Sequence, residues 1–213
     1  VTALRTSYEA AREKLAAGLP TTSREFQKRF PDGVAAPPQK GLSIYASCEP
    51  SNPADRGLTT AKWEGDGVPK QVAGRIGQAL QFNGTNSRWV LGHPGYFRGQ
   101  QPFTIAAWIH TTQASGSIVT QLDEDQAFRG LDFTTHQGMI ELHLVHEWPN
   151  NGIKVTTPSV IKTNQWHHVL VRYSGSRKAA GVEILVDGKP QTLKVQVDAL
   201  TDTSVSSEPI RLG

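Results

Sequence analysis

A change of hydrophobic period at residue 41 constrains the fold of this chain more than any other feature. Beyond it, apolar and polar residues alternate in short runs with a period of two, which is typical of β-strands that bury one face. The runs expected to form strands are residues 42–46, 79–82, 103–109, 139–145, 168–173, 182–186 and 193–197. Many short strands without helices between them indicate an antiparallel all-β sandwich or barrel.

Turn-forming residues separate these runs. Asn83-Gly84, Gln137-Gly138 and Asp187-Gly188 carry the residue types that tight β-hairpin turns require. Asn83 also opens a formal glycosylation sequon with Thr85, but we expect a hairpin at this position. The chain beyond residue 41 therefore reads as one sandwich domain of residues 41–213.

Residues 1–40 have a different composition. Leu4, Tyr8, Ala11 and Leu15 follow helical spacing, and Pro37-Pro38 marks a linker. We expect a short helical N-terminal segment and linker over residues 1–40. The formal net charge of +3 comes from this segment, because basic and acidic residues balance over residues 41–213.

Several classes of function are excluded by what the sequence lacks. The balanced charge of residues 41–213 offers no basic surface for nucleic acid. No run of apolar residues is long enough for a membrane span. Cys48 is the single cysteine, which excludes a disulfide framework and a haem attachment motif. No leader pattern opens the sequence, so we expect a signal peptide to have been removed or to lie upstream.

Three segments resemble the laminin-G-like, concanavalin-A-like lectin/glucanase domains in order and spacing. They are GRIGQALQFNG at 74–84, PFTIAAWI at 102–109, and QWHHVLVRY at 165–173 followed by VEILVDGK at 182–189. The resemblance implies an antiparallel jelly-roll β-sandwich of the concanavalin-A-like type. It also implies that the final strand of the family, which carries an acidic motif, is missing after Gly213, so we expect a partner chain or a second fragment to complete the sheet.

A narrower resemblance involves residues 123–132, 143–155 and 175–181. These segments are similar to a branch found in large bacterial multidomain proteins, best known from planctomycetes, that also contain c-type haem domains. Such proteins are exported, so the resemblance implies a periplasmic or extracellular location.

Glycoside hydrolysis is the enzyme activity to test first, because sandwich glucanases share this architecture. Their carboxylates stand two residues apart on one strand, since only such residues share a face. The strand at 139–147 offers Glu141 and Glu147, six residues apart, with His143 and Val145 between them. We therefore predict no enzyme activity and no catalytic residue, with a glycoside hydrolase as the less favoured alternative.

Metal ligands are weakly indicated. His143 and His146, like His167 and His168, would point to opposite faces of a strand, and neither pair has the spacing of a zinc site. The resemblance allows Ca²⁺, with Asp66, the Asn83-Gly84 turn and the acidic loop at 123–125 as ligands, but no regular spacing specifies a site.

The aromatic residues divide into two groups. Trp108 and Trp166 lie in apolar strands, and we expect both in the core. Trp148 ends a strand and enters a polar loop, where an indole face can pack on a sugar ring while amides, carboxylates and guanidinium groups bind hydroxyls. The residues expected to bind carbohydrate are Trp148, Asn150, Asn151, His146, Arg129, Glu141 and His143. This grouping requires that strands 128–134 and 139–147 pair; the alternative is that Trp148 only packs its loop on the sheet.

The sequence thus predicts a non-catalytic carbohydrate-binding module of a larger exported bacterial protein, with a polysaccharide or oligosaccharide as partner. Its binding surface would be the concave sheet and the loops around 123–130 and 146–152. The alternative is a protein-interaction or structural module that packs against neighbouring domains of the parent protein.

Overall fold

The computed structural model describes residues 40–49, 55–58 and 60–213. The chain divides into two compact units, Val1–Leu42 and Ser43–Gly213. The expected helical segment at 1–40 lies outside the described residues except for Lys40, and it stays a prediction. Within the described residues no helix is long and apolar enough to cross a membrane.

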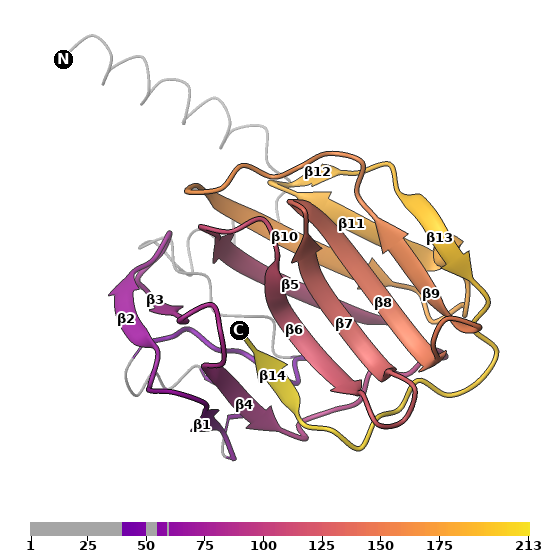
Figure 1. Ribbon diagram of the computed structural model, residues 1–213, viewed down its shortest axis with the longest axis horizontal. Helices are drawn as coiled ribbons and strands as arrows, with labels where there is room; N and C mark the ends of the chain where they lie inside the picture. The colour runs from indigo at the N-terminus through magenta and orange to yellow at the C-terminus, as the bar shows by residue number, and fades with distance from the viewer. Residues whose placement is uncertain (1–39, 50–54, 59) are drawn as a thin grey trace, which may run out of the picture. The chain divides into compact units, whose positions relative to one another are not determined.

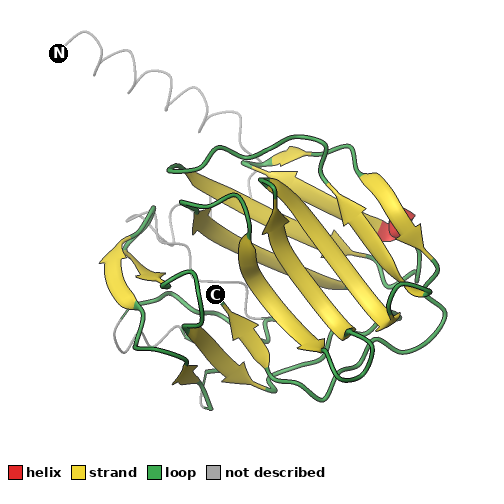
Figure 2. Cartoon of the chain, in the orientation of Figure 1, coloured by secondary structure: helices red, strands yellow, loops and turns green. Residues whose placement is uncertain are grey.

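The second unit is built from strands and loops (Figure 2). Its strands are β1 (Lys62–Glu64), β2 (Lys70–Ala73), β3 (Gln78–Gln81), β4 (Arg88–Gly92), β5 (Phe103–His110), β6 (Gly116–Asp123), β7 (Arg129–His136), β8 (Met139–Glu147), β9 (Asn151–Thr156), β10 (Trp166–Tyr173), β11 (Val182–Val186), β12 (Lys189–Pro190), β13 (Lys194–Asp198) and β14 (Ile210–Leu212). A 3-10 turn, η1 (Ala179–Gly181), precedes β11.

Two sheets form the sandwich. The larger one has the strand order β1-β4-β14-β6-β7-β8-β9-β13, and the smaller one has the order β12-β11-β10-β5. In Figure 1 strands β6 to β9 of the larger sheet lie in front of β5, β10 and β11. Strands β2 and β3 pair in a separate ribbon, and neighbouring strands throughout are antiparallel. The predicted antiparallel jelly-roll sandwich is confirmed.

The core lies between the two sheets. Leu131, Phe133 and Leu144 from the larger sheet have no exposed surface, and neither do Val169 and Val171 from the smaller one. All five belong to one hydrophobic cluster. Successive side chains of a strand point to opposite faces, so the residues between these face outwards.

The turn formed by Gln137 and Gly138 sets the register of the β7–β8 hairpin. Gln137 and Gly138 both have a positive φ, at 52° and 79°, which matches the type I′ turn that suits a two-residue hairpin. His136 therefore pairs with Met139, and each step back along β7 is matched by one step forward along β8. The required pairing of strands 128–134 and 139–147 is confirmed.

Two expectations about strands and turns are wrong. Residues 42–46 form no strand; Tyr45 makes only an isolated bridge to Arg56. Asn83-Gly84 is not a hairpin turn, because β3 pairs with β2 whereas β4 pairs with β1 and β14. Instead, the Asn83 Oδ1 atom accepts hydrogen bonds from the amides of the next loop residues, Thr85, Asn86 and Ser87.

Trp108 is also misplaced by the sequence analysis. It is 42% exposed, because Phe103, Ile105, Ala107 and Ile109 take the inward positions of β5 and leave the even-numbered residues facing outwards. Trp166 is half-buried and packs beside His110, with ring centroids 5.4 Å apart.

Candidate functional site

A row of polar side chains crosses the outer face of the larger sheet. Thr120 of β6 lies opposite Asp132 of β7, Asp132 opposite His143 of β8, and His143 opposite Lys154 of β9. Residues directly opposite one another on antiparallel strands share a face and lie about 5 Å apart. We call Asp132, His143 and Lys154, together with Glu141 and Trp148, the outer-face cluster.

Glu141 occupies the neighbouring position on β8 and is neutralised within the chain. Its side chain is 5% exposed, and its Oε2 atom lies 3.3 Å from the Lys154 Nζ atom. The same oxygen accepts a 2.9 Å hydrogen bond from the Thr156 hydroxyl. Glu141 is therefore covered and paired by side chains of the chain itself.

Asp132 has no such partner. Among the described residues, no side chain or backbone amide forms a hydrogen bond or ion pair with its carboxyl group. The pKa of Asp132 is raised to about 6, mainly by burial and also by the negative charge of Glu141, while Lys154 acts in the opposite direction. A carboxyl group that titrates near neutral pH and lacks a partner is typical of functional sites.

His143 is the second unpaired group of the row. Its Nε2 atom is buried without a hydrogen-bond partner in the described part of the chain. Burial is the main cause that lowers the pKa of His143 to about 4, with a further contribution from Lys154. The imidazole is therefore neutral near pH 7, when one ring nitrogen donates and the other accepts a hydrogen bond.

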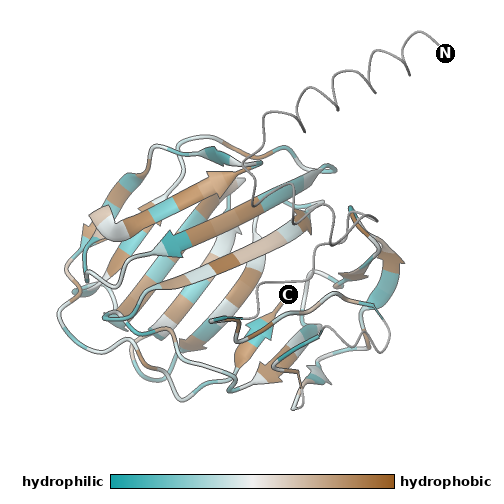
Figure 3. Cartoon of the chain, turned by 180° about the vertical axis from the view of Figure 1, so that it is seen from behind, coloured by the Kyte–Doolittle hydropathy of each residue, from teal (hydrophilic) through white to brown (hydrophobic). Residues whose placement is uncertain are grey.

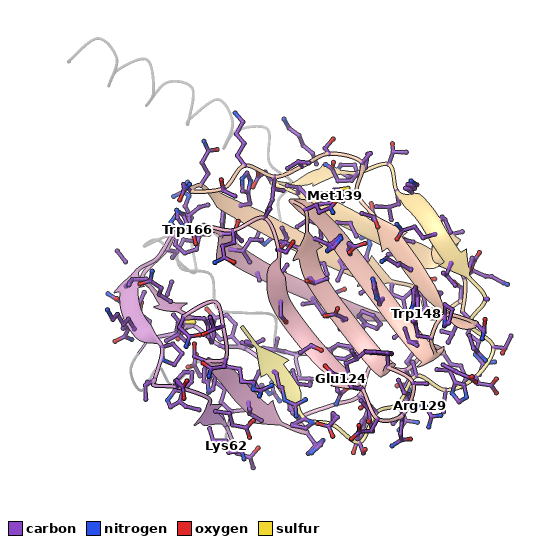
Figure 4. All side chains as sticks on the ribbon, in the orientation of Figure 1. Lys62, Glu124, Arg129, Met139, Trp148 and Trp166 are labelled. Carbon is purple, nitrogen blue, oxygen red and sulfur yellow. The ribbon has the colours of Figure 1, made fainter. Side chains whose placement is uncertain are left out.

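Trp148 folds back over this row from the end of β8 (Figure 4). Its indole ring stacks on the His143 imidazole, with centroids 5.4 Å apart and planes 11° apart. The Lys154 Nζ atom lies 5.7 Å from the indole centroid. The indole thus contacts side chains from two neighbouring strands, His143 of β8 and Lys154 of β9.

The other predicted binding residues lie at the ends of β7, β8 and β9 or, for Asn150, in the turn between β8 and β9. Asn151 donates to Thr201 and Asp202 and accepts from the Thr201 amide. The His146 Nδ1 atom lies 2.8 Å from the Thr203 carbonyl oxygen. The side chains of Asn151 and His146 therefore hold the loop at residues 201–203 against the sheet.

Arg129 donates to the His146 carbonyl oxygen and to Gln126, whereas Asn150 is exposed in the turn. The structure thus brings Glu141, His143 and Trp148 together and places Arg129, His146 and Asn151 in a separate network.

The acidic residues named as calcium ligands are engaged in two different loops. Asp123 accepts hydrogen bonds from the amides of Asp125 and Gln126, and Asp66 accepts one from the Asn86 side chain. Within the described residues, no group of three or more His, Cys, Asp or Glu side chains is arranged to hold a metal ion. Calcium binding stays a prediction.

Asp132 and Lys154 were missed by the sequence analysis. Asp132 could have been found, because counting equal steps from the Gln137-Gly138 turn pairs it with His143. Lys154 could not be found in this way, because the register between β8 and β9 shifts between Val145 and Glu147. Such a bulge changes which residues face each other and leaves little trace in the hydrophobic pattern.

The chain is similar to known protein structures and matches one family model. Similar solved structures include domains LG4-5 of the mouse laminin alpha1 chain, with 21% identity over 54% of this chain and 28% of that chain and a TM-score of 0.42. The native heptameric SAP-like pentraxin from Limulus polyphemus shares 18% identity over 55% of this chain and 54% of its own, with a TM-score of 0.38. The conserved carbohydrate esterase vb_24B_21 from Shiga toxin-encoding bacteriophage phi24B shares 14% identity over 71% and 86%, with a TM-score of 0.37.

This chain therefore spans about a quarter of the laminin chain and about half of the pentraxin chain. No curated protein matches it. The family model described as the Concanavalin A-like lectin/glucanases superfamily matches residues 83–213, which include the whole outer-face cluster. The chain belongs to this laminin-G-like family.

Proposed function

We propose that this domain binds carbohydrate without cleaving it, through the outer-face cluster. The observation that carries the proposal is an indole that stacks on His143, next to an Asp132 carboxyl group that has no partner within the described residues. Asp132, His143 and Lys154 are each partly exposed, and among the described residues the ring contacts of Trp148 come from His143 and Lys154. The half-buried indole offers its remaining exposed surface to the apolar face of a sugar ring.

The state of the two carboxyl groups supports binding over hydrolysis. A glycosidase needs one carboxylic acid and one carboxylate that both reach the bond to be cleaved. Asp132 and Glu141 are the two carboxyl groups of the cluster, but the Glu141 side chain is 5% exposed and held by Lys154. A sugar that lies on the cluster would therefore meet only one open carboxyl group.

Glycan-array binding of the wild type and Trp148→Ala tests the proposal. We expect Trp148→Ala to weaken binding about tenfold, while circular dichroism shows an unchanged fold. Trp108→Ala is the matched control, because it removes an exposed indole from the other sheet. An unchanged array profile for Trp148→Ala would reject this location of the site. Running both arrays with calcium and with chelator tests calcium at the same time.

A second candidate function, protein interaction, is favoured by one edge of the smaller sheet. Strand β5 ends this sheet, and in the described part of the chain only β10 pairs with it. The inward residues of β5 are half-buried, whereas Val169 and Val171 of β10 are fully covered. None of the eight residues of β5 is Lys, Glu, Asp, Arg or Pro, the residues that commonly protect an edge from further pairing.

An additional apolar strand at β5 would complete both the hydrogen-bond ladder and the core. Hydrogen exchange on the full-length parent protein tests this candidate. If a neighbouring domain or second fragment supplies the strand, the β5 amides that do not face β10 exchange as slowly as those of β10. Rapid exchange of these amides would argue against the candidate.

We further propose that the parent protein is exported to the periplasm or the outside of a bacterium, as the narrower resemblance implies. Fractionation of cells that express the full-length protein tests this location, and recovery from the cytoplasmic fraction alone would contradict it.

A further inference from the structure

Two neighbouring groups of the outer-face cluster lack hydrogen-bond partners. The Asp132 carboxyl group and the His143 Nε2 atom lie on paired positions of β7 and β8, and among the described residues neither has a partner. Buried polar groups in folded proteins are nearly always hydrogen-bonded. A ligand that donates hydrogen bonds to the partly exposed Asp132 carboxyl group would remove part of this deficit.

The charges around Asp132 indicate which ligand fits. Lys154 is the cation of the cluster, and Glu141 neutralises it. Arg211 of β14, which lies opposite Thr120, is paired with Glu208 at 2.5 Å. The ionised Asp132 carboxylate is therefore the charge of the outer-face cluster that has no ion-pair partner within the described residues. A uronic acid polymer would be repelled by it, whereas a neutral sugar offers hydroxyl donors.

We propose that the Asp132 carboxylate anchors a neutral glycan by accepting hydrogen bonds from two adjacent sugar hydroxyls, and that this binding releases a proton. The inference rests on the proposed carbohydrate-binding function and adds the class of glycan and its pH dependence. Hydrogen bonds to an ionised carboxylate are stronger than those between neutral groups. When the glycan binds, the O–H bond of the protonated Asp132 breaks and the proton passes to the solvent.

The sign of the pH dependence follows from the free protein. Burial holds the pKa of Asp132 at about 6, and hydroxyl donors that bind its charged form lower this pKa. Affinity therefore rises with pH through 6 and levels off above it. At pH 5 about one molecule in ten has the ionised carboxylate, so we expect about tenfold weaker binding at pH 5 than at pH 7.

The other titratable groups near Asp132 are few. His143 on β8 has a pKa of about 4 and stays neutral between pH 5 and 7. Glu141 and Lys154 on β8 and β9 form an ion pair. His136, at the end of β7, contributes to the electrostatic surroundings of His143, so a His136→Gln variant is needed as a control.

Calorimetry of the intact domain tests the inference. The probes are neutral xylan, mannan, galactan and β-glucan, with alginate and polygalacturonate as acidic counterparts. Titrations at pH 5, 6 and 7 in two buffers of different ionisation enthalpy give both the affinity and the number of protons released. We expect a neutral glycan to bind, with about tenfold tighter binding at pH 7 than at pH 5 and proton release near pH 6.

One test variant and two control variants make the result specific. Asp132→Asn should bind at least tenfold more weakly at pH 7 and show no pH dependence, whereas His136→Gln and Glu147→Gln should behave like the wild type. Binding that is independent of pH, or tighter binding of the acidic polymers, would overturn the inference while leaving carbohydrate binding intact. Failure of every glycan to bind would overturn both. Proton release by the wild type is a test that does not depend on any variant.

Discussion

The outer faces of the two sheets are built by the same alternation but have opposite chemistry. On the larger sheet the outward positions of β7 and β8 include Asp132 and His143, which are polar and unpaired within the described residues. On the smaller sheet the outward positions include Trp108, exposed and packed beside His168, and the half-buried Leu170. Figure 3 shows the bands of hydrophobic and hydrophilic residues along the strands from behind.

This difference separates two kinds of recognition. Unpaired polar groups beside an aromatic ring suit a small ligand rich in hydroxyl groups. A face with an exposed indole and an aliphatic side chain beside an open strand edge suits a polypeptide. The period of two predicts only that outward positions exist; the residues that occupy them decide what each face can bind.

The largest expected effect on the free energy of unfolding comes from the hydrophobic core between the two sheets. Phe133→Ala removes a side chain with no exposed surface, so we expect a loss of about 3–5 kcal/mol in the free energy of unfolding. Urea denaturation measures it, and Val160→Ala, at a position 63% exposed, serves as a control near zero. A small loss in Phe133→Ala would mean that the two sheets do not share a tightly packed core.

The next effect distinguishes the paired carboxylate from the unpaired one. Lys154→Met leaves Glu141 covered and without its cation, and we expect it to lower the free energy of unfolding by about 3 kcal/mol. Adding Glu141→Gln to this variant should restore most of the stability. If the double variant is no more stable than Lys154→Met, the two side chains do not act as a pair.

Asp132 and His143 should influence stability with opposite signs as pH falls. The pKa of Asp132 is raised to about 6, so the folded state binds a proton before the unfolded chain does and gains stability as pH falls through 6. The pKa of His143 is lowered to about 4, so the unfolded chain binds its proton first and the fold loses stability between pH 6.5 and 4. In the wild type the two effects nearly cancel.

Single variants expose each of these slopes. Asp132→Asn should be up to about 3 kcal/mol more stable than the wild type at pH 7.5 and lose most of this advantage by pH 4.5. His143→Gln should become more stable relative to the wild type as pH falls over the same range. Denaturant titrations at the two pH values measure both, and slopes of the same sign would contradict the assigned environments.

The smallest expected effect concerns the outer face of the smaller sheet. Trp108→Thr removes an exposed ring and its contact with the Arg75 guanidinium, 5.5 Å away, so we expect a loss of about 0.5 kcal/mol. Thermal denaturation at two salt concentrations measures it. A loss above about 2 kcal/mol would show that Trp108 is covered in solution and that this face is not open.

The sequence predicts where the strands of this molecule lie better than it predicts which strands pair with one another. The span of β11 was predicted to the residue, and β5, β8 and β10 nearly so, because alternation is a local property. Strand β14, three residues long and inserted between β4 and β6, could not be predicted, since it is held by partners distant in the chain. Trp108 was misplaced because an apolar run does not reveal which of its two faces is buried.

The candidate site was predictable in part for the same reason. Trp148 and His143 lie on or beside one strand, and Asp132 follows from a two-residue turn, whereas the bulge between Val145 and Glu147 concealed Lys154. The hydrogen bonds of Asn151 with Thr201 and Asp202 join segments about fifty residues apart. No local pattern shows that these bonds occupy its side chain.

The most direct test compares the dissociation constants of Trp148→Ala and Trp108→Ala for one neutral polysaccharide at pH 7. If the larger sheet carries the binding face, the Trp148 variant binds about tenfold more weakly than the wild type and the Trp108 variant binds equally well. Equal affinity of the wild type and the Trp148 variant, or a loss confined to the Trp108 variant, would contradict the assignment of the two faces.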